Sequence, residues 1–163
     1  MTTALIQTAD GTFTAYFSGT GLARLDFPIG GRVSRSNRTG LSAQAGAWLS
    51  LTERALKQAL SGKSPGKWPP LDLSAGTEFQ RCVWNALREI RSGQTKSYAQ
   101  VAQAIDRPGA VRAVGQACGA NPIPVVIPCH RVLAAGGKLG GFSAGLDWKL
   151  KLLGREGVVP ESD

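Results

Sequence analysis

The chain has few of the residues that build metal centres and disulfide scaffolds. Its 163 residues include three cysteines and one histidine. A zinc site made of these residue types alone would need all of them, yet Cys129 and His130 are neighbours in sequence. Neighbouring side chains rarely reach the same tetrahedral ion, so we expect no metal site. An odd, small number of cysteines also argues against a disulfide framework.

Targeting and membrane-spanning patterns are also missing. The first residues show no basic stretch followed by an apolar one, and no apolar run approaches the length that crosses a bilayer. We therefore expect a cytoplasmic protein of a reducing compartment, with no membrane partner. The length suits one domain or two small ones, and 42% hydrophobic residues suffice for a packed core.

Acidic residues are in the minority. Lys and Arg total 19 against 11 Asp and Glu, which gives a formal net charge of +8. Such a charge suits a polyanionic partner such as nucleic acid, but it is equally compatible with solubility alone. Within residues 81–131 basic side chains far outnumber acidic ones.

Alternating apolar residues mark the N-terminal segment as β-structure. Phe13, Ala15 and Phe17 alternate with polar residues, which predicts short strands over residues 4–29. A polar, basic connector over residues 30–40 follows.

A helix is expected next, over residues 42–61. Ser42 is a suitable N-cap, and Gly62 suits the helix exit. The proline-rich segment 64–70 then predicts a linker. We therefore expect residues 1–70 to form a small domain of antiparallel β-sheet and helix.

Two capping boxes mark helix starts in the second half, one at Thr77-x-x-Gln80 and one at Ser97-x-x-Gln100. A short connector with Pro108 leads to a further helix at about 109–119, and we expect Pro108 near its first turn. Two helices joined by so short a connector predict a helix-turn-helix of the winged kind.

The last helix is expected from Leu146 onward, with Gly154 as its cap. Residues 74–158 would then form a mainly helical second domain, followed by a tail over 159–163. The predicted fold class is α+β.

The helix at 109–119 has unusually small side chains. Val111, Val114, Gly115 and Cys118 form one face. The opposite face consists of Gly109, Ala110, Arg112, Ala113, Gln116 and Ala117. Such a smooth face suits close approach to a DNA groove, and it equally suits packing on another helix. We expect close helix–helix packing at Gly115, because glycine inside a helix costs about 1 kcal/mol relative to alanine.

Cys129 precedes the only histidine of the chain, His130. The thiolate form of cysteine is the nucleophile, and a nearby imidazole can take up the thiol proton. Adjacent residues of an extended segment point to opposite sides, so this pairing requires a turn, which Pro128 can set. A buried structural cysteine beside a solvated histidine is the alternative. We interpret Cys82 and Cys118 as small core residues.

The block Pro128-Cys129-His130-Arg131, preceded by Asn121-Pro122-Ile123-Pro124, resembles the active-site signature of the O6-alkylguanine-DNA alkyltransferases, also called methylated-DNA–protein-cysteine methyltransferases. The resemblance covers residues 74–157. Its other motifs are Gly76-Thr77-x-Phe79-Gln80, Val83-Trp84, Gly93-x-Thr95, Ser97-Tyr98, Arg107-Pro108-x-Ala110-x-Arg112-Ala113-Val114-Gly115, Ser143-x-Gly145-Leu146 and Lys149-x-x-x-Leu153. The first 70 residues match only in general layout.

The resemblance implies DNA repair by direct reversal. The protein would flip O6-alkylguanine, with O4-alkylthymine as a second candidate lesion, out of double-stranded DNA through the minor groove. It would transfer the alkyl group irreversibly to Cys129, once per molecule, as a single-turnover (suicide) methyltransferase without a cofactor. A monomer in the cytoplasm is expected, associated with the nucleoid, or in the nucleus of a eukaryote. The alternative is a non-catalytic, alkyltransferase-like lesion-binding protein, a class that lacks the reactive cysteine.

The resemblance also assigns catalytic roles. His130, acting through a water, and Glu156 would keep the sulfur of Cys129 ionised. Asn121 would link the helix-turn-helix to the active-site loop, and Tyr98 would support protonation of the leaving guanine. Arg131 is interpreted as structural.

The DNA contacts implied by the resemblance are centred on Arg112, which would fill the gap left by the flipped nucleotide. The other expected DNA-contacting residues are Ala110, Ala113, Gln116, Ala117 and Tyr98. The expected base pocket consists of Tyr98, Val132, Phe142, Ser143 and Cys129. Ser143 would contact the O6 position. Two pocket positions depart from the family pattern, with Phe142 where Tyr is frequent and Ala144 where Gly is usual.

Overall fold

Three antiparallel strands form the N-terminal sheet of the computed structural model, which describes residues 1–30 and 40–162. The strands are β1 (Thr2–Thr8), β2 (Gly11–Phe17) and β3 (Leu22–Asp26), in that spatial order. Phe13, Ala15 and Phe17 point into the core and are at most 1% exposed. The strands predicted over residues 4–29 are therefore confirmed.

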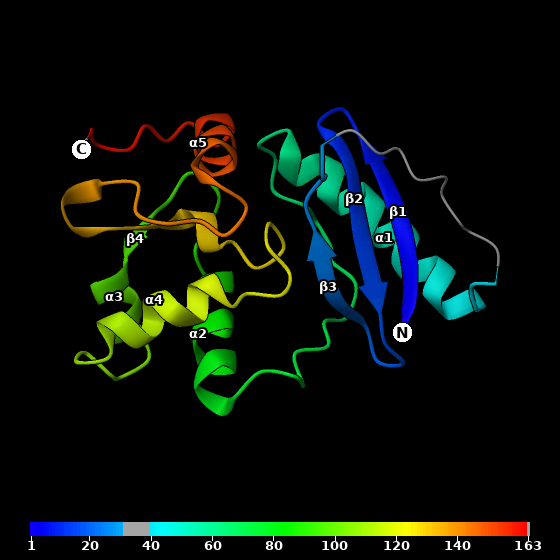
Figure 1. Cartoon of the computed structure of the whole chain (residues 1–163), viewed down its shortest axis with the longest axis horizontal. Coiled ribbons are helices and arrows are strands. Elements are labelled where there is room, and N and C mark those ends of the chain that lie inside the picture. The colour runs from blue at the N-terminus through cyan, green and yellow to red at the C-terminus, as the bar shows by residue number, and fades with distance from the viewer. Residues whose placement is uncertain (31–39, 163) are drawn as a thin grey trace.

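Helix α1 (Ala43–Leu60) covers one face of this sheet (Figure 1). The Ser42 side chain accepts a hydrogen bond from the backbone N–H of Ala45, as expected of the N-cap. Gly62 follows the helix in a left-handed conformation, with φ of 80°. The strands β1–β3 and helix α1 are called the sheet unit below. The connector predicted over residues 30–40 falls almost wholly on 31–39, outside the described residues.

The end of the predicted linker lies along β3. The backbone N–H of Leu22 donates to the carbonyl of Pro70, and the N–H of Asp72 donates to the carbonyl of Leu22, each at 2.8 Å. A side chain at Gly21 would collide with the Pro70 carbonyl. The chain is thus anchored to the sheet before it enters the second half.

The second half of the chain, from the start of α2 at Glu78 to the end of α5 at Arg155, is mainly helical (Figure 1). It is called the helical unit below. Both predicted capping boxes are present, at Thr77 with Gln80 and at Ser97 with Gln100. Short strands β4 and β5 pair in parallel. The elements are α2 (Glu78–Arg88), β4 (Lys96–Ser97), α3 (Tyr98–Ala104), α4 (Val111–Gly119), the 3-10 helix η1 (Cys129–Arg131), β5 (Val132–Leu133), the 3-10 helix η2 (Ala135–Gly137) and α5 (Leu146–Arg155). The predicted α+β fold class is confirmed.

Two predicted helix ends are wrong. Helix α4 begins at Val111 because the N–H of Ala110 closes a separate turn on the carbonyl of Arg107, so Pro108 lies before the helix. Helix α5 runs through Gly154 and ends at the C-cap Glu156. The glycine with the left-handed conformation that ends helices is Gly157, with φ of 79°.

The orientation of α4 also differs from the expectation. Ala117 is 2% exposed and belongs to the core, whereas Val111 is 38% exposed. The indole Nε1 of Trp84 donates to the carbonyl of Ala117 at 2.8 Å, which holds this side of α4 against α2. Cys82 is exposed, so its interpretation as a core residue is wrong, while Cys118 is buried as expected.

Aromatic rings join the sheet unit to the helical unit. Phe27, just after β3, lies 4.8 Å from Trp148 of α5 and 5.8 Å from Phe142, measured between ring centroids. Phe13 of β2 also contacts Trp148, at 5.8 Å. The two units therefore share one hydrophobic core. None of the described helices is long and apolar enough to cross a membrane.

Candidate active site

Cys129 opens the 3-10 helix η1, directly after Pro128. The turn that the sequence requires at this proline is present. The Cys129 side chain is buried and lines a cavity of about 160 Å³. Burial raises the pKa of the thiol, while hydrogen bonding by Asn121 and the charge of Lys149 act in the opposite direction. A thiol in this position needs a proton acceptor to become a nucleophile.

Asn121 shapes the segment that carries the thiol. Its Nδ2 donates to the carbonyl of Ile127 at 2.8 Å, and its Oδ1 accepts from the N–H of Ile123 at 2.9 Å. Asn121 is buried, so these hydrogen bonds are shielded from water. Asn121 thereby bridges residues 123 and 127 and connects the end of α4 to the turn before Cys129.

His130 is 1% exposed, and its Nε2 lies 3.0 Å from Oε1 of Glu156. Burial lowers the pKa of His130, although the carboxylate of Glu156 opposes this effect. A neutral imidazole that donates from Nε2 to the carboxylate keeps Nδ1 as a proton acceptor. The fully buried Nδ1 atom of His130 is left without a hydrogen-bond partner among the described residues and is thus able to accept a proton.

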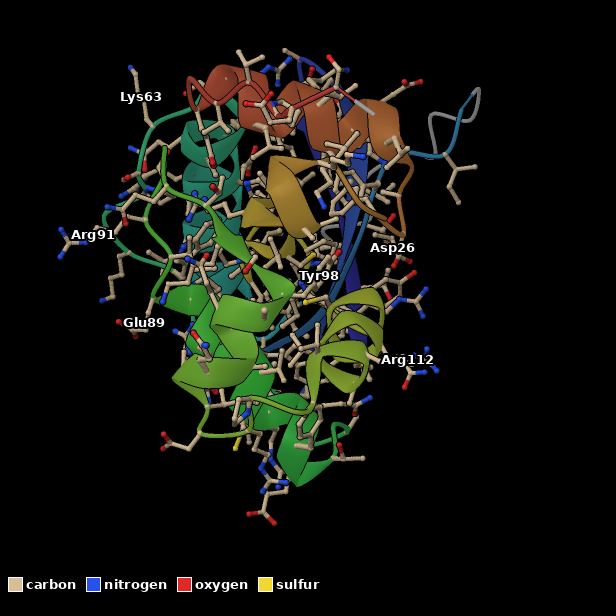
Figure 2. All side chains as sticks on the ribbon, turned by 90° about the vertical axis from the view of Figure 1, so that its left-hand side faces the viewer. Asp26, Lys63, Glu89, Arg91, Tyr98 and Arg112 are labelled. Carbon is tan, nitrogen blue, oxygen red and sulfur yellow. The ribbon has the colours of Figure 1, made fainter. Side chains whose placement is uncertain are left out.

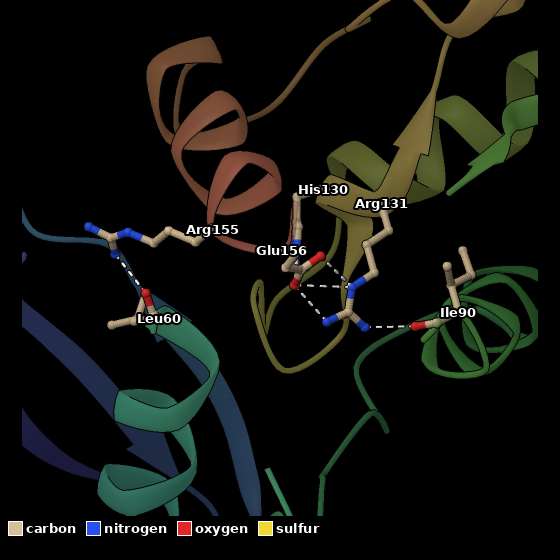
Figure 3. A network of polar contacts seen from close by, with 6 residues as sticks. All are labelled: Leu60, Ile90, His130, Arg131, Arg155 and Glu156. Atoms are coloured by element: carbon tan, nitrogen blue, oxygen red, sulfur yellow. Dashed lines mark hydrogen bonds and ion pairs between the residues drawn. The ribbon is translucent and has the colours of Figure 1, made fainter. Parts of the chain in front are cut away.

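Glu156 also binds Arg131, as Figure 3 shows. The guanidinium donates from Nε to both carboxylate oxygens, at 3.2 and 3.0 Å, and from Nη2 to Oε1 at 2.7 Å. Arg131 Nη1 donates to the carbonyl of Ile90 at 2.7 Å. Burial would raise the pKa of Glu156, but the hydrogen bonds from His130 and Arg131 outweigh it and hold the pKa at about 2. The structural interpretation of Arg131 fits these contacts.

The cavity in front of Cys129 contains four of the five residues expected in the base pocket. Its lining consists of Tyr98, Gly115, Cys118, Gly119, Cys129, Gly141, Phe142 and Ser143. Val132, the fifth expected residue, is fully buried and is not part of the lining. A methyl group at Gly115 would meet only the ring of Tyr98, at 3.9 Å, so close helix packing does not explain this glycine. It forms an open wall of the cavity instead.

Lys149 is a feature of the site whose burial the sequence reasoning missed. It is fully buried in α5, and its Nζ donates to the carbonyls of Val132 at 2.7 Å and Gly141 at 3.1 Å. Burial lowers the pKa of this lysine to about 8. Two signals in the sequence pointed to this lysine: the motif Lys149-x-x-x-Leu153 of the family resemblance, and its spacing from the buried Leu152 and Leu153, which places all three on one helical face.

The side chains at the surface of α4 are mostly small, as predicted, and Arg112 is the one long cationic side chain among them. Arg112 is exposed and points away from the body of the protein, while Tyr98 lies inward beside the cavity (Figure 2). Gln116 is exposed, and Ala110 and Ala113 are half-buried. Ala117 is missing from this surface because its side chain is buried. Within the described residues, no cluster of His, Cys, Asp and Glu could hold a metal ion.

Comparison with known proteins covers both halves of the chain. The family model for the DNA-binding domain of 6-O-methylguanine DNA methyltransferase matches residues 78–158. An inducible methylated-DNA–protein-cysteine methyltransferase of Bacillus subtilis is 50% identical over 101 residues, which cover 62% of this chain and 56% of that one. A methylated-DNA–protein-cysteine methyltransferase of Mycolicibacterium paratuberculosis is 57% identical over 86 residues, covering 53% and 52%. The matched segment thus spans about half the length of these curated relatives.

Solved structures extend the similarity to the sheet unit. The structure of Mycobacterium tuberculosis OGT in complex with DNA has a TM-score of 0.71 and 35% identity, covering 93% of this chain and 90% of that one. The O6-methylguanine-DNA methyltransferase from Pyrococcus kodakaraensis shares the fold, with a TM-score of 0.63 at 24% identity. Because it shares this fold and is 35% identical to the Mycobacterium tuberculosis protein over 93% of its length, the chain belongs to the O6-methylguanine-DNA methyltransferase family.

Proposed function

We propose that this protein repairs O6-alkylguanine in double-stranded DNA by transferring the alkyl group to Cys129 in a single turnover. The observation that carries the proposal is the buried thiol of Cys129 in the wall of a cavity of about 160 Å³, next to the His130–Glu156 pair. The relatives reported above are named as methyltransferases of this kind, which supports the same reaction here.

The reaction follows from these groups. His130 Nδ1 takes up the thiol proton, directly or through a water, and Glu156 stabilises the resulting imidazolium. The thiolate attacks the alkyl carbon, a carbon–sulfur bond forms, and the bond between that carbon and O6 breaks. The electron pair stays with the guanine, which gains a proton with help from the Tyr98 hydroxyl. A thioether offers no easy leaving group, so each molecule reacts once.

Access to the base requires its extrusion from the duplex. We assign α3 and α4 to a helix-turn-helix that enters the minor groove with Arg112, Ala113, Ala110 and Gln116. Arg112 would occupy the gap in the base stack, because unstacking costs a few kcal/mol and an inserted side chain offsets this cost. Tyr98 lines the cavity at the base of this surface.

Further proposals follow from the same assignment. Residues 1–70 and 74–158 act as two domains of a monomer, located in the cytoplasm on the nucleoid. O4-alkylthymine is a second candidate substrate. A non-catalytic lesion-binding protein is disfavoured, because a buried thiol, a base and a carboxylate at this site have no role in binding alone.

Mass spectrometry tests the transfer. A duplex with one O6-methylguanine should add one methyl group, in a one-to-one ratio, to a peptide that contains Cys129. Cys129→Ala should bind the same duplex without transfer, whereas Cys82→Ser, which changes an exposed thiol, should react like the unaltered protein. Unmodified protein, or turnover beyond one equivalent, would contradict the proposal.

A further inference from the structure

The last turn of α5 is held from two sides. Glu156 faces His130 and Arg131, whereas the preceding residue, Arg155, points in the opposite direction, toward the sheet unit (Figure 3). The Arg155 guanidinium donates from Nη1 and Nη2 to the two carboxylate oxygens of Asp10, each at 2.7 Å. Its Nη1 also donates to the carbonyl of Leu60 at 2.8 Å.

These contacts come from two elements of the sheet unit. Asp10 lies in the turn between β1 and β2, and Leu60 is the last residue of α1. The backbone takes part as well, since a side chain at Gly62 would collide with the carbonyl of Arg155. Hydrogen bonds thus hold the side chain of Arg155 to the sheet unit, and Gly62, just after α1, packs closely against its backbone.

Glu156 follows Arg155 directly in the chain. As the C-cap of α5, it is attached to the helix through its backbone N–H, which donates to the carbonyls of Leu152 and Leu153 at 3.2 and 3.0 Å. A shift of the last turn would change the 3.0 Å separation between its Oε1 and the Nε2 of His130. Hydrogen bonds to a charged group weaken steeply with such changes in distance and angle.

We propose that the sheet unit positions the carboxylate of Glu156, with Asp10 holding Arg155 and thereby holding Glu156 against His130. Asp10 and Arg155 are positioning residues, because neither lines the cavity in front of Cys129. The fork geometry of the ion pair supports a role in orientation, since a guanidinium with two parallel bonds allows little rotation. Part of this inference, its effect on alkyl transfer, rests on the proposed function.

A purely stabilising role makes a different prediction. If the ion pair only joins the two units, its removal lowers the free energy of unfolding and leaves the basicity of His130 unchanged. If it positions Glu156, its removal weakens the support of His130, so that His130 takes up the thiol proton less readily. The reactivity of Cys129 then falls at neutral pH, and its pH profile moves to higher pH.

The test uses the full-length protein with Asp10→Asn, Arg155→Gln, their double variant and the charge-exchanged pair Asp10→Arg with Arg155→Asp. Arg24→Gln is the matched control, because it removes an arginine from the Arg24–Asp26 ion pair, both partners of which belong to β3. The readout is the rate of Cys129 alkylation by iodoacetamide between pH 5 and 10, followed by peptide mass spectrometry. Thermal unfolding is measured in parallel.

Each single variant should lower the neutral-pH alkylation rate several-fold, because the link acts on Cys129 through Glu156 and His130. The double variant should be no slower than either single variant, because both remove the same link. The charge-exchanged pair should recover part of the rate, and Arg24→Gln should change nothing. Lower stability with an unchanged pH profile would overturn the inference.

Iodoacetamide needs no DNA, so the two proposals fail separately. A shifted alkylation profile in a protein that accepts no methyl group from DNA would refute the proposed function alone. Normal transfer from methylated duplex, with alkylation profiles that coincide in all variants, would refute the positioning role alone.

Discussion

His130 Nε2 and Glu156 Oε1 lie 3.0 Å apart, and the two side chains are 1% and 4% exposed. A carboxylate so deeply buried needs compensation, because its transfer from water is costly. Arg131 supplies the opposite charge at 2.7 Å, so the imidazole is free to remain neutral. His130, whose Nδ1 is able to accept a proton, and Arg131, which neutralises the carboxylate of Glu156, are therefore different residues.

Replacement of the Glu156 carboxylate should reduce stability and change its dependence on pH. The pKa of Glu156, about 2, lies below its ordinary value of 4.5. The stability that it contributes is therefore complete above pH 4.5 and lost as the pH falls toward 2, because the unfolded chain takes up the proton first. Glu156→Gln should cost about 3 kcal/mol at pH 7 and flatten the pH dependence of stability in this range. Urea unfolding at several pH values measures both effects.

Arg112→Ala should slow methyl transfer at saturating DNA about tenfold or more, because the extruded base loses the side chain that fills its place. Arg91→Ala removes the same charge on another side of the molecule (Figure 2) and should change only the salt-dependent affinity. Single-turnover kinetics on methylated duplex separates the two effects. Equal losses of transfer rate in both variants would argue against insertion of Arg112 into the base stack.

Trp84→Phe should lower the free energy of unfolding by about 1–2 kcal/mol, because the carbonyl of Ala117 at the end of α4 loses its indole donor. Trp48→Phe, on the half-buried side of α1, serves as the control for loss of an indole ring. Denaturant unfolding with a near-ultraviolet circular dichroism signal measures the difference. A Trp84 variant as stable as the unaltered protein would show that this bond contributes nothing to the placement of α4.

Lys149→Met should loosen the wall of the cavity, since the carbonyls of Val132 and Gly141 lose a shared donor. We expect a loss of about 1–3 kcal/mol in stability and a slower transfer from methylated duplex. Lys63→Met, at an exposed lysine, should leave both quantities unchanged. If the Lys149 variant transferred at the normal rate, the two hydrogen bonds would be irrelevant to the shape of the pocket.

Local signals in the sequence predicted local structure well. The capping boxes at Thr77 and Ser97 and the alternation in β2 depend on neighbours within a few residues, and the structure contains them as expected. The expected base-pocket residues came instead from the family resemblance, and four of the five line the cavity. Glycine was a less reliable guide to the ends of helices. Gly154 was predicted to end the last helix, whereas Gly157 is the residue that adopts the left-handed conformation.

Long-range contacts explain the remaining differences. Both faces of α4 carry small residues, so hydrophobic contrast could not show which face is buried, and the contact from Trp84 to Ala117 decides it. A lysine is normally expected at the surface, so the burial of Lys149 could not be foreseen from its residue type. No periodic pattern connects Asp10 with Arg155.

Asp10 and Arg155 are 145 positions apart in the chain. Contacts between such distant residues form late in folding, since the loop that they close loses much conformational entropy. The turn at Pro128 and the two capping boxes depend on neighbours within a few residues, whereas the cavity is lined by residues from Tyr98 to Ser143. With Asp10 and Arg155 in the positioning role proposed above, the reactivity of Cys129 depends on a contact between residues at distant positions of the chain, in the β1–β2 turn and at the end of α5.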